Sequence, residues 1–276
     1  MIKILIIGSK GMLGTELVEV FSTSDYKVYK ADLPEIDITD SASIQGKLGE
    51  IKPDIVINAA AFTDVDGCEE QIELCHKVNG QALEYLVKEC NKVGSTLVHY
   101  STDYVFDGEK EEGYKEADQT NPQSQYGKSK ELGEKNLQKY GDKYYLIRLS
   151  WLFGKHGNNF VETMLRLARE KDRLEVVNDQ FGKPTYAKDL AIRTKELLES
   201  QKAFGIYHIT NEGVTSWYDF TREIFKLAGI KTPVTPVTTD KFPRPAKRPH
   251  YSGLINTKLP LSRPWQEALG EYLDEI

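Results

Sequence analysis

The amino-acid sequence predicts an α/β fold of the doubly wound type, with a parallel sheet wrapped by helices and a smaller C-terminal lobe. Short β-branched runs alternate with helical patterns through the first half of the chain. These runs are continuously apolar, which is typical of parallel strands that helices cover on both faces. A glycine triplet follows the first run directly and opens the first predicted helix.

The predicted elements follow one another regularly up to about residue 150. Strands are predicted at 3–8, 27–31, 54–60, 96–102 and 144–150, and helices near 12–22, 41–51, 68–93 and 124–140. Beyond this point the rhythm loosens, with helices at 158–171, 187–200 and 216–228, short strands at 174–177 and 206–209, and a long irregular, proline-rich segment over 231–253. We therefore expect one domain over residues 1–150 and a smaller lobe over 151–276, with crossings of the chain between them.

Composition restricts the class of protein. The 276 residues carry a formal net charge of −6, which argues against nucleic acid or an anionic membrane as a partner. The longest apolar runs are far shorter than a membrane span, and no signal peptide is expected at the N-terminus. The three cysteines, Cys68, Cys75 and Cys90, show no metal-ligand spacing and are expected to be free thiols in a reducing cytoplasm.

The stretch "IIGSKGMLG" places Gly8, Gly11 and Gly14 between the first strand and the first helix. Glycine lets the backbone approach a ligand closely, and a helix N-terminus offers free N–H groups to a diphosphate. The spacing is G-x-x-G-x-x-G, and Asp32 follows 18 residues beyond Gly14, where a carboxylate can bind the ribose of a dinucleotide. The alternatives are a tight turn without a ligand and an Asp32 that only begins the next turn.

A tyrosine stands four residues before a lysine at two places, Tyr126/Lys130 and Tyr26/Lys30. On a helix this spacing brings the two side chains together, and an ammonium beside a phenol lowers the pKa of the phenol. Ligands bind at the carboxyl ends of the strands in a doubly wound sheet, and Tyr26 stands before the second strand. We therefore expect Tyr126 and Lys130 to be the functional pair.

These motifs together resemble the extended short-chain dehydrogenase/reductase superfamily, which has a Rossmann-type fold. More narrowly, "NAAAFTDVDGCE", "HYSTDYVFDG", "NPQSQYGKSKELGE", "SWLFGKHGNNFVETMLRLA" and "VVNDQFGKPT" resemble the dTDP-4-dehydrorhamnose reductase family. The resemblance runs from residue 1 to about residue 265. It implies reduction of a 4-keto-6-deoxy sugar nucleotide by NADPH or NADH, the last step of dTDP-L-rhamnose synthesis.

The resemblance also implies roles for individual residues. Tyr126 is the expected proton donor, Lys130 tunes it and bonds the nicotinamide ribose, and Thr102 bonds the reacting carbonyl oxygen. Asp103 and Trp151 are expected at the sugar. The implied cofactor-binding residues are Gly8, Gly11, Met12, Leu13, Gly14, Asp32, Asp37, Ile38, Ala61, Phe62, Thr63, Tyr126 and Lys130.

The nucleotide half of the substrate is expected to contact the smaller lobe. Asn158 is predicted to cap a helix whose N-terminus could face a diphosphate. Arg244, Lys247 and Arg248 form a basic cluster in an otherwise acidic chain, and arginine can bind a diphosphate with two hydrogen bonds. We take Arg248 as the candidate ligand, with a solvated basic loop as the alternative.

Asp32 favours NADH, because its carboxylate would repel the 2′-phosphate of NADPH. Lys30, two residues earlier on the strand, could soften that repulsion, so NADH is expected to serve at least comparably with NADPH. The alternative functions are a reductase or epimerase of another nucleotide sugar and a non-catalytic regulatory subunit that binds the cofactor. No metal is expected. The oligomeric state is open, with a homodimer as one alternative.

Overall fold

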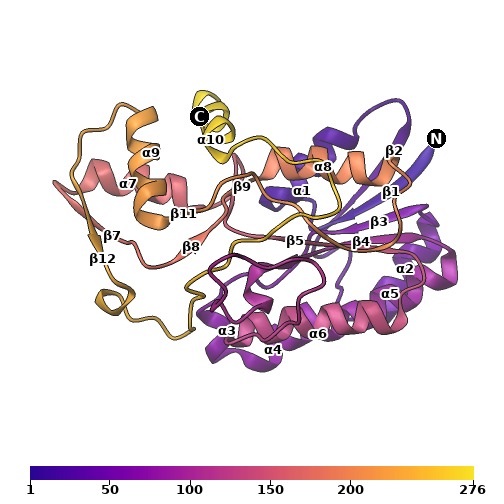
Figure 1. The fold of residues 1–276 in the computed structure, drawn as a ribbon. Helices are drawn as coiled ribbons and strands as arrows, with labels where there is room; N and C mark the ends of the chain where they lie inside the picture. The colour runs from indigo at the N-terminus through magenta and orange to yellow at the C-terminus, as the bar shows by residue number, and fades with distance from the viewer.

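The computed structural model describes residues 1–276, and it confirms the predicted α/β fold (Figure 1). Six strands form one parallel sheet in the order β10-β5-β4-β3-β1-β2. Their bounds are β1 (Ile2–Ile7), β2 (Tyr26–Ala31), β3 (Ile55–Asn58), β4 (Thr96–Thr102), β5 (Tyr144–Leu149) and β10 (Gly205–His208).

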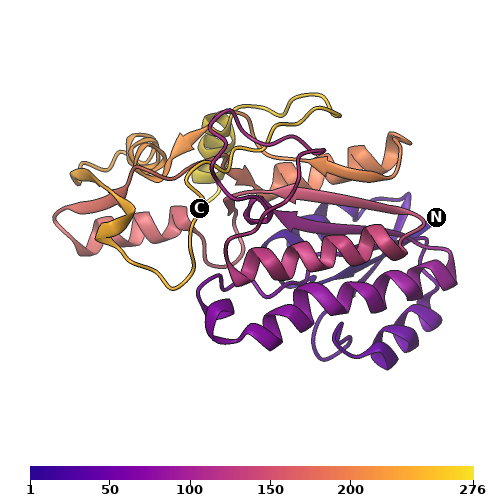
Figure 2. The same cartoon turned by 60° about the horizontal axis from the view of Figure 1, so that its bottom comes forward.

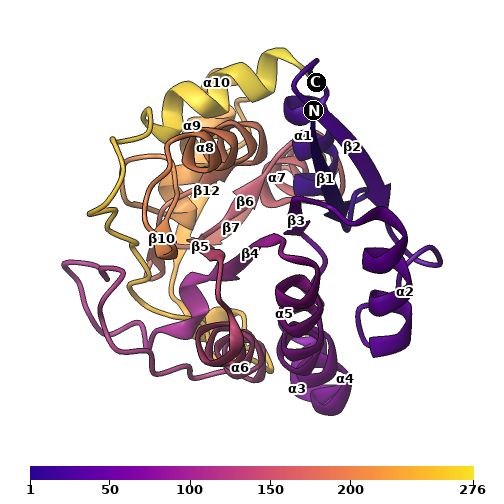
Figure 3. The same cartoon turned by 90° about the vertical axis from the view of Figure 1, so that its right-hand side faces the viewer.

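Helices cover both faces of this sheet (Figure 3). On one face lie α1 (Met12–Phe21) and α8 (Ala187–Glu199); on the other lie α2 (Ser41–Ile51), α5 (Ala82–Val93) and α6 (Gln125–Tyr140). Successive side chains of a strand point to opposite faces. Ile4 and Ile6 of β1 accordingly pack in the core beneath α1 and α8, whereas Leu5 and Ile7 pack in the core beneath α2, α5 and α6.

The strand order reverses between β1 and β3. From β1 the chain runs first to β2 on one side and then to β3 on the other. In open α/β sheets such a switch point leaves a crevice at the carboxyl ends of the strands, which is where ligands bind.

The prediction of one continuous helix over 68–93 is wrong, because the structure divides this segment into several helices. The segment contains α3 (Gly67–Glu70), α4 (Ile72–His76), a π-helical turn (Lys77–Gln81) and then α5. The first break lies at Gln71, whose backbone is not helical (φ −111°, ψ 51°). Figure 2 shows α5 running beside α6 across the sheet. The three cysteines are free, as expected, and all three are buried.

The smaller lobe has its own core of 13 buried residues, in which Phe153, Phe220 and Tyr272 pack together. Its main elements are α7 (Phe160–Glu170), β7 (Leu174–Val177), α9 (Trp217–Leu227) and β12 (Val234–Val237), with the short pairs β6 (Leu152–Phe153)–β9 (Thr185–Tyr186) and β8 (Phe181–Gly182)–β11 (Thr215–Ser216). β12 corrects the expectation of an irregular segment over 231–253. It pairs in parallel with β7 in a two-stranded sheet, where an edge strand tolerates Pro236.

The chain crosses back from the smaller lobe to the six-stranded sheet. α8 packs against α1, and β10 extends the sheet at β5. The strand predicted at 206–209 therefore exists but belongs to the larger sheet, because its partner is set by tertiary packing.

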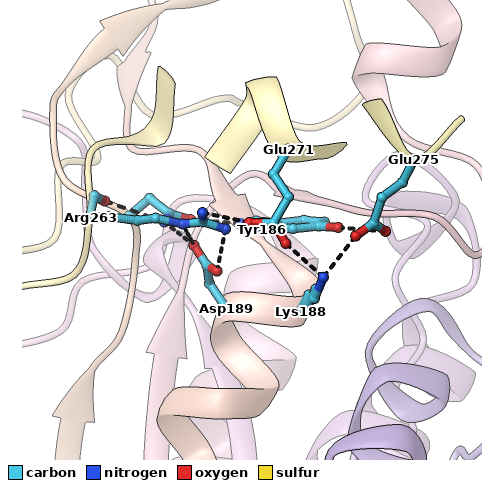
Figure 4. A network of polar contacts seen from close by, with 7 residues as sticks. Tyr186, Lys188, Asp189, Arg263, Glu271 and Glu275 are labelled. Atoms are coloured by element: carbon cyan, nitrogen blue, oxygen red, sulfur yellow. Dashed lines mark hydrogen bonds and ion pairs between the residues drawn. The ribbon is translucent and has the colours of Figure 1, made fainter. Parts of the chain in front are cut away.

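A final helix, α10 (Trp265–Asp274), was not predicted. Ion pairs formed by Lys188 and Arg263 connect α10 and the loop before it to α8 (Figure 4). Lys188 on α8 donates to Glu271 (2.6 Å) and Glu275 (2.7 Å), and Arg263 donates twice to Asp189 (2.8 and 2.7 Å). The end of the chain is thus fastened to the layer that covers the sheet. No helix combines the length and the apolar character that crossing a membrane requires.

Candidate active site

The glycine loop packs tightly against Ala59 and Ala60, the residues that follow β3. Gly8 has a left-handed backbone (φ +77°), and a Cβ there would lie 2.6 Å from the backbone nitrogen of Ala60. A Cβ on Gly14 would lie 2.0 Å from the carbonyl oxygen of Gly8. Only glycine fits at either position. The loop therefore brings the N-terminus of α1 to the switch point of the sheet.

The first turn of α1 has free backbone donors. Gly11 is the N-cap and is exposed, and no side chain caps the helix. The amides of Met12 and Leu13 therefore have no intrahelical acceptor, as in the first turn of any helix. Leu13 is also part of the buried core and anchors the turn. This arrangement suits a diphosphate, since it presents N–H groups and the positive end of a helix dipole.

Asp32 follows β2 at the same edge of the sheet. Its carboxylate accepts hydrogen bonds from the backbone N–H groups of Lys10 (3.1 Å) and Leu33 (2.9 Å). The Lys10 ammonium lies close by, 3.4 Å from the carbonyl oxygen of Leu33 and 3.8 Å from Glu35. An anion and a cation thus stand together at the expected ribose position.

The residues expected to flank the adenine and nicotinamide follow β2 and β3. The carboxylate of Asp37 accepts two hydrogen bonds from Thr39, which lower the pKa of Asp37, while Ile38 is buried in the core. The Asn79 side chain clamps the backbone of Phe62, accepting from its N–H (2.8 Å) and donating to its carbonyl (2.9 Å). Ala61 and Thr63 flank this clamp. The buried Asn79 side chain, carried by the π-helical turn, therefore fixes the loop after β3.

Thr102, Asp103 and Tyr126 lie together at the carboxyl end of β4. The hydroxyl of Thr102, the last residue of β4, donates to the Asp103 carboxylate (2.9 Å). Oδ2 of Asp103 is buried and has no partner at normal hydrogen-bond geometry, with the Ser252 hydroxyl near the carboxylate. Burial raises the pKa of Asp103 to about 6, against the opposing effects of Ser252 and Thr102. An unpaired buried polar atom at a strand end marks a place for a polar ligand group.

Tyr126 is the second residue of α6, and its ring packs edge-on against Tyr104 at 5.5 Å. Burial and the negative charge of Asp103 raise the pKa of Tyr126, while a hydrogen bond with Thr102 acts in the opposite direction. The phenol is therefore protonated at neutral pH and has a proton to donate.

Lys130 makes no hydrogen bond with Tyr126, and its role in lowering the pKa of the phenol stays a prediction. Its ammonium points into the protein, donates to the carbonyl oxygen of Tyr100 (2.6 Å) and faces Nε2 of His99 (3.3 Å). The backbone carbonyl, rather than the phenol, is its hydrogen-bond partner.

The second tyrosine–lysine pair lies elsewhere. Tyr26 begins β2 and donates to Glu199 at the far end of α8 (2.8 Å), away from the carboxyl edge. On a strand, side chains four residues apart are separated by about 13 Å, so Tyr26 and Lys30 do not form a working pair.

Trp151 follows β5 with a positive φ of 48°, which is uncommon for a residue other than glycine. Its ring stacks on Trp217 with centroids 3.4 Å apart and planes 7° apart. A Cβ on Gly182 would lie 2.6 Å from Cε2 of Trp151, closer than to Nε1 (2.7 Å) or Cζ2 (2.9 Å). Gly182 therefore lies against the face of the Trp151 ring that Trp217 does not cover. Trp151 is half-buried, with Trp217 stacked on it and Gly182 packed close to it.

In the smaller lobe the predicted N-cap needs correction, and the role of Arg248 as a diphosphate ligand stays a prediction. The N-cap of α7 is Asn159, whose side chain accepts from the N–H of Glu162 (3.1 Å), whereas Asn158 is exposed one residue earlier. Arg248 is not a free cation, because it donates to both carboxylate oxygens of Asp66 (2.6 and 2.8 Å). A substrate diphosphate would have to compete with Asp66 for this guanidinium.

Sequence reasoning missed several residues that the structure brings to this site. Lys10, His99 and Trp217 lie beside Asp32, Lys130 and Trp151 respectively. Lys10 had a usable signal, because it lies inside the glycine loop. The other two contacts join segments that are far apart in the chain, and no local pattern reveals them.

A glycine loop at the switch point of a parallel sheet, and a tyrosine and lysine on the helix after the fourth strand, define the class of extended short-chain dehydrogenases/reductases. A family model described as the RmlD substrate binding domain matches residues 2–276. The chain belongs to this family, whose relatives include the dTDP-4-dehydrorhamnose reductases.

Curated relatives match along the whole chain. A spore coat polysaccharide biosynthesis protein of Bacillus subtilis is 41% identical, covering 100% of this chain and 98% of the relative. The dTDP-4-dehydrorhamnose reductase of Aggregatibacter actinomycetemcomitans is 40% identical, covering 98% and 97%.

Solved structures agree with this assignment. A dTDP-4-dehydrorhamnose reductase of Clostridium acetobutylicum has a TM-score of 0.96 and 45% identity, covering 99% of both chains. The Bacillus anthracis reductase, solved in complex with NADP, has a TM-score of 0.97 and 37% identity, again over 99% of both chains. A UDP-glucose 4-epimerase of Thermotoga maritima, at 20% identity and a TM-score of 0.85, shares the fold alone.

Proposed function

We propose that this chain reduces dTDP-4-dehydro-L-rhamnose to dTDP-L-rhamnose, with NADPH or NADH as the hydride donor. The grouping of Thr102, Asp103 and Tyr126 at the carboxyl end of β4, at the sheet edge that also carries the glycine loop, carries this proposal. The family of this chain supports the proposal. One relative, 45% identical, is named as a dTDP-4-dehydrorhamnose reductase, and another relative with this name was solved with NADP.

The chemistry divides between the cofactor and the chain. The reduced nicotinamide, when bound, supplies a hydride to C4 of the keto sugar. The free amides of α1 and the closely packed glycine loop hold the diphosphate, and Asp32 takes the adenosine ribose. The Thr102 hydroxyl turns from the Asp103 carboxylate to donate its one proton to the carbonyl oxygen of the sugar. The protonated phenol of Tyr126 delivers a proton to that oxygen as negative charge develops. The unpaired Oδ2 of Asp103 accepts from a sugar hydroxyl.

The test is to incubate the protein with the keto sugar nucleotide and follow the absorbance of reduced nicotinamide. We expect substrate-dependent loss of absorbance and formation of dTDP-L-rhamnose. A reductase for another nucleotide sugar would show no loss with this substrate but loss with its own. An epimerase would change the product without net oxidation, and a regulatory subunit would bind the cofactor without turnover.

Lys10 and Asp32 together set the cofactor preference. The Asp32 carboxylate favours an unmodified ribose, and the nearby Lys10 ammonium can pair with the 2′-phosphate of NADPH. We expect NADH to serve at least comparably with NADPH, Asp32→Ala to move the preference toward NADPH, and Lys10→Ala to move it toward NADH.

The measurement is kcat/KM with each cofactor at a saturating concentration of the sugar nucleotide. Lys27→Ala, at the opposite end of β2 from Asp32, is the control and should leave the ratio unchanged. A wild-type preference for NADPH beyond about a hundredfold, near 2.7 kcal/mol, would show that Asp32 does not face the ribose.

Trp151 contributes to the sugar pocket. We expect Trp151→Phe to lower kcat/KM for the sugar nucleotide by roughly three- to tenfold, the equivalent of one aromatic contact, while KM for the cofactor stays the same. The melting temperature of this variant should be close to that of the wild type. Normal kinetics with a melting temperature several degrees lower would make Trp151 a structural residue.

Two further expectations belong to this function. We place the enzyme in the cytoplasm, where reduced nicotinamide and nucleotide sugars are made. A homodimer remains an expectation, and light scattering at several protein concentrations would test it.

A further inference from the structure

One carboxylate joins the nucleotide-binding domain to the smaller lobe. Asp66 stands immediately before α3, and its partners lie in the basic loop, residues 244–248. Arg248 donates to both carboxylate oxygens (2.6 and 2.8 Å), and the N–H of Ala246 donates to Oδ1 (3.2 Å). A second guanidinium, that of Arg244, lies 3.9 Å from Oδ2. The donors of the basic loop therefore gather around a single anion.

These donors are the ones that proteins use to bind phosphate groups. A guanidinium matches two oxygens of a phosphate or a carboxylate with two parallel hydrogen bonds. A carboxylate brings one negative charge, whereas a diphosphate brings more than one and has oxygens on two phosphorus atoms. Because Arg244 and Arg248 both lie against the Asp66 carboxylate, a diphosphate in its place could contact both guanidinium groups.

The ion pair is open to exchange with other anions. The side chains of Asp66 and Arg248 are 26% and 19% exposed, and that of Arg244 is 64% exposed. Solvent and dissolved ions weaken such a pair, in contrast to the fully buried pair of Arg148 with Glu134. A ligand anion can therefore reach the Arg248 guanidinium without first unfolding the loop.

The pair also lies beside the candidate proton donor. Burial is the largest influence on the pKa of Tyr104, and the charges of Arg248, Asp103 and Asp66 act on it as well. The ring of Tyr104 packs edge-on against Tyr126 at 5.5 Å. An anion that replaces the Asp66 carboxylate would thus be held next to the residues expected to contact the sugar.

We propose that Asp66 is an internal competitor for the diphosphate of the substrate. Without substrate, its carboxylate holds Arg248 and ties the basic loop to α3. When the substrate binds, the diphosphate takes Arg248 from Asp66 and contacts Arg244 as well. Asp66 therefore sets how tightly a nucleoside diphosphate binds. The proposal rests on the proposed function for the identity of the ligand, but the affinity is measurable without turnover.

The first test is the affinity of Asp66→Asn for dTDP, measured by titration calorimetry. Asparagine keeps an oxygen that can accept from Ala246, but it has no charge to hold the guanidinium. We expect the Kd of dTDP to fall about three- to fivefold, the equivalent of one partly exposed ion pair. An unchanged or higher Kd would overturn the proposal, because Asp66 would then orient Arg248 or only join the two lobes.

Two further variants separate this competition from a general change of charge. Asp64→Asn removes the same charge two residues earlier, where the carboxylate accepts from the N–H of Gly67 (2.9 Å), and it should bind dTDP like the wild type. Asp66→Asn/Arg248→Gln should bind dTDP no more tightly than the wild type, because no guanidinium is left to free. The same gain in Asp64→Asn, or a double variant as tight as Asp66→Asn, would refute the competition.

The wild-type protein gives an independent measurement. The hydrogen bond from Arg248 is the largest influence on the pKa of Asp66 and lowers it, and Arg244 acts in the same direction. The other charged or titratable groups near the pair are Tyr104 and Glu69. In protein labelled with ¹³C at the aspartate carboxyls, saturating dTDP should raise the pKa of Asp66, because the carboxylate loses its cation. A pKa that stays the same or falls would show that the pair remains intact.

These results stand apart from the assay of turnover. Reduction of the keto sugar nucleotide by a protein whose dTDP affinity ignores Asp66 would refute the competition and leave the proposed function standing. The expected gain of affinity in a protein that does not reduce this substrate would do the reverse.

Discussion

Replacing Tyr126 by phenylalanine is expected to lower turnover by about a hundredfold or more, as the loss of a positioned general acid does. The half-buried phenol on α6 faces the Thr102 hydroxyl, and its raised pKa keeps it protonated at neutral pH. Phenylalanine keeps the ring and its edge-on contact with Tyr104, so the fold and cofactor binding should be preserved. Turnover is measured with saturating substrate and cofactor, and cofactor binding by fluorescence titration.

Tyr26→Phe is the matched control, because it removes a tyrosine hydroxyl from the opposite edge of the sheet. In the wild type the Tyr26 hydroxyl donates a hydrogen bond only to Glu199, so the turnover of Tyr26→Phe should differ little from that of the wild type. Near-normal turnover in Tyr126→Phe would refute the assignment of the proton donor. Loss of turnover in Tyr26→Phe instead would mean that the wrong edge of the sheet was taken as the site.

The elements of the nucleotide-binding half were predictable because each depends on a local pattern. The continuous apolar run of β1 needs helices on both faces, and the glycine triplet after it fits only a strand-to-helix turn. Position within this βα alternation was also enough to prefer Tyr126 over Tyr26. The alternation of strands and helices along the sequence therefore predicted both the fold class and the sheet edge that carries the candidate site.

The elements that were missed depend on contacts between distant segments. β12 lies in a proline-rich stretch that reads as irregular, and only its pairing with β7 makes it a strand. β10 has the right sequence for a strand, but the sequence does not show which sheet it joins. The same holds for α10, which packs Trp265, Leu269 and Tyr272 into the core of the smaller lobe and pairs with Lys188 of α8.

The electrostatics of the site also depend on distant residues. Arg248 reads as a free cation until Asp66, 182 residues away, is found beside it. Lys130 reads as the cation next to Tyr126 until the carbonyl oxygen of Tyr100 and the ring of His99 are seen to face it. The role of a charged residue can therefore be assigned only when its hydrogen-bond and ion-pair partners in the fold are known.

The largest expected effect on stability comes from Arg148→Met. Arg148 on β5 donates to both oxygens of Glu134 on α6 (2.9 and 2.6 Å), with the two side chains 2% and 1% exposed. Removing the arginine leaves a buried carboxylate with only the Ser101 hydroxyl, 2.5 Å away, as its partner. Breaking one side of a buried pair costs about 3–5 kcal/mol in the free energy of unfolding. We expect a loss of this size in urea or thermal unfolding.

Two further variants separate the loss of the pair from the stranded charge. In Arg148→Met/Glu134→Leu both charges are gone, and an apolar pair of similar volume is often as stable as the ions it replaces. We therefore expect the double variant to recover most of the stability lost in Arg148→Met. The surface pair Arg166–Glu170, with side chains 61% and 50% exposed, is the control, and Arg166→Met should cost less than about 1 kcal/mol. If the double variant is no more stable than Arg148→Met, the guanidinium contributes through its packing against Phe106 and its contact with His208 rather than by neutralising Glu134.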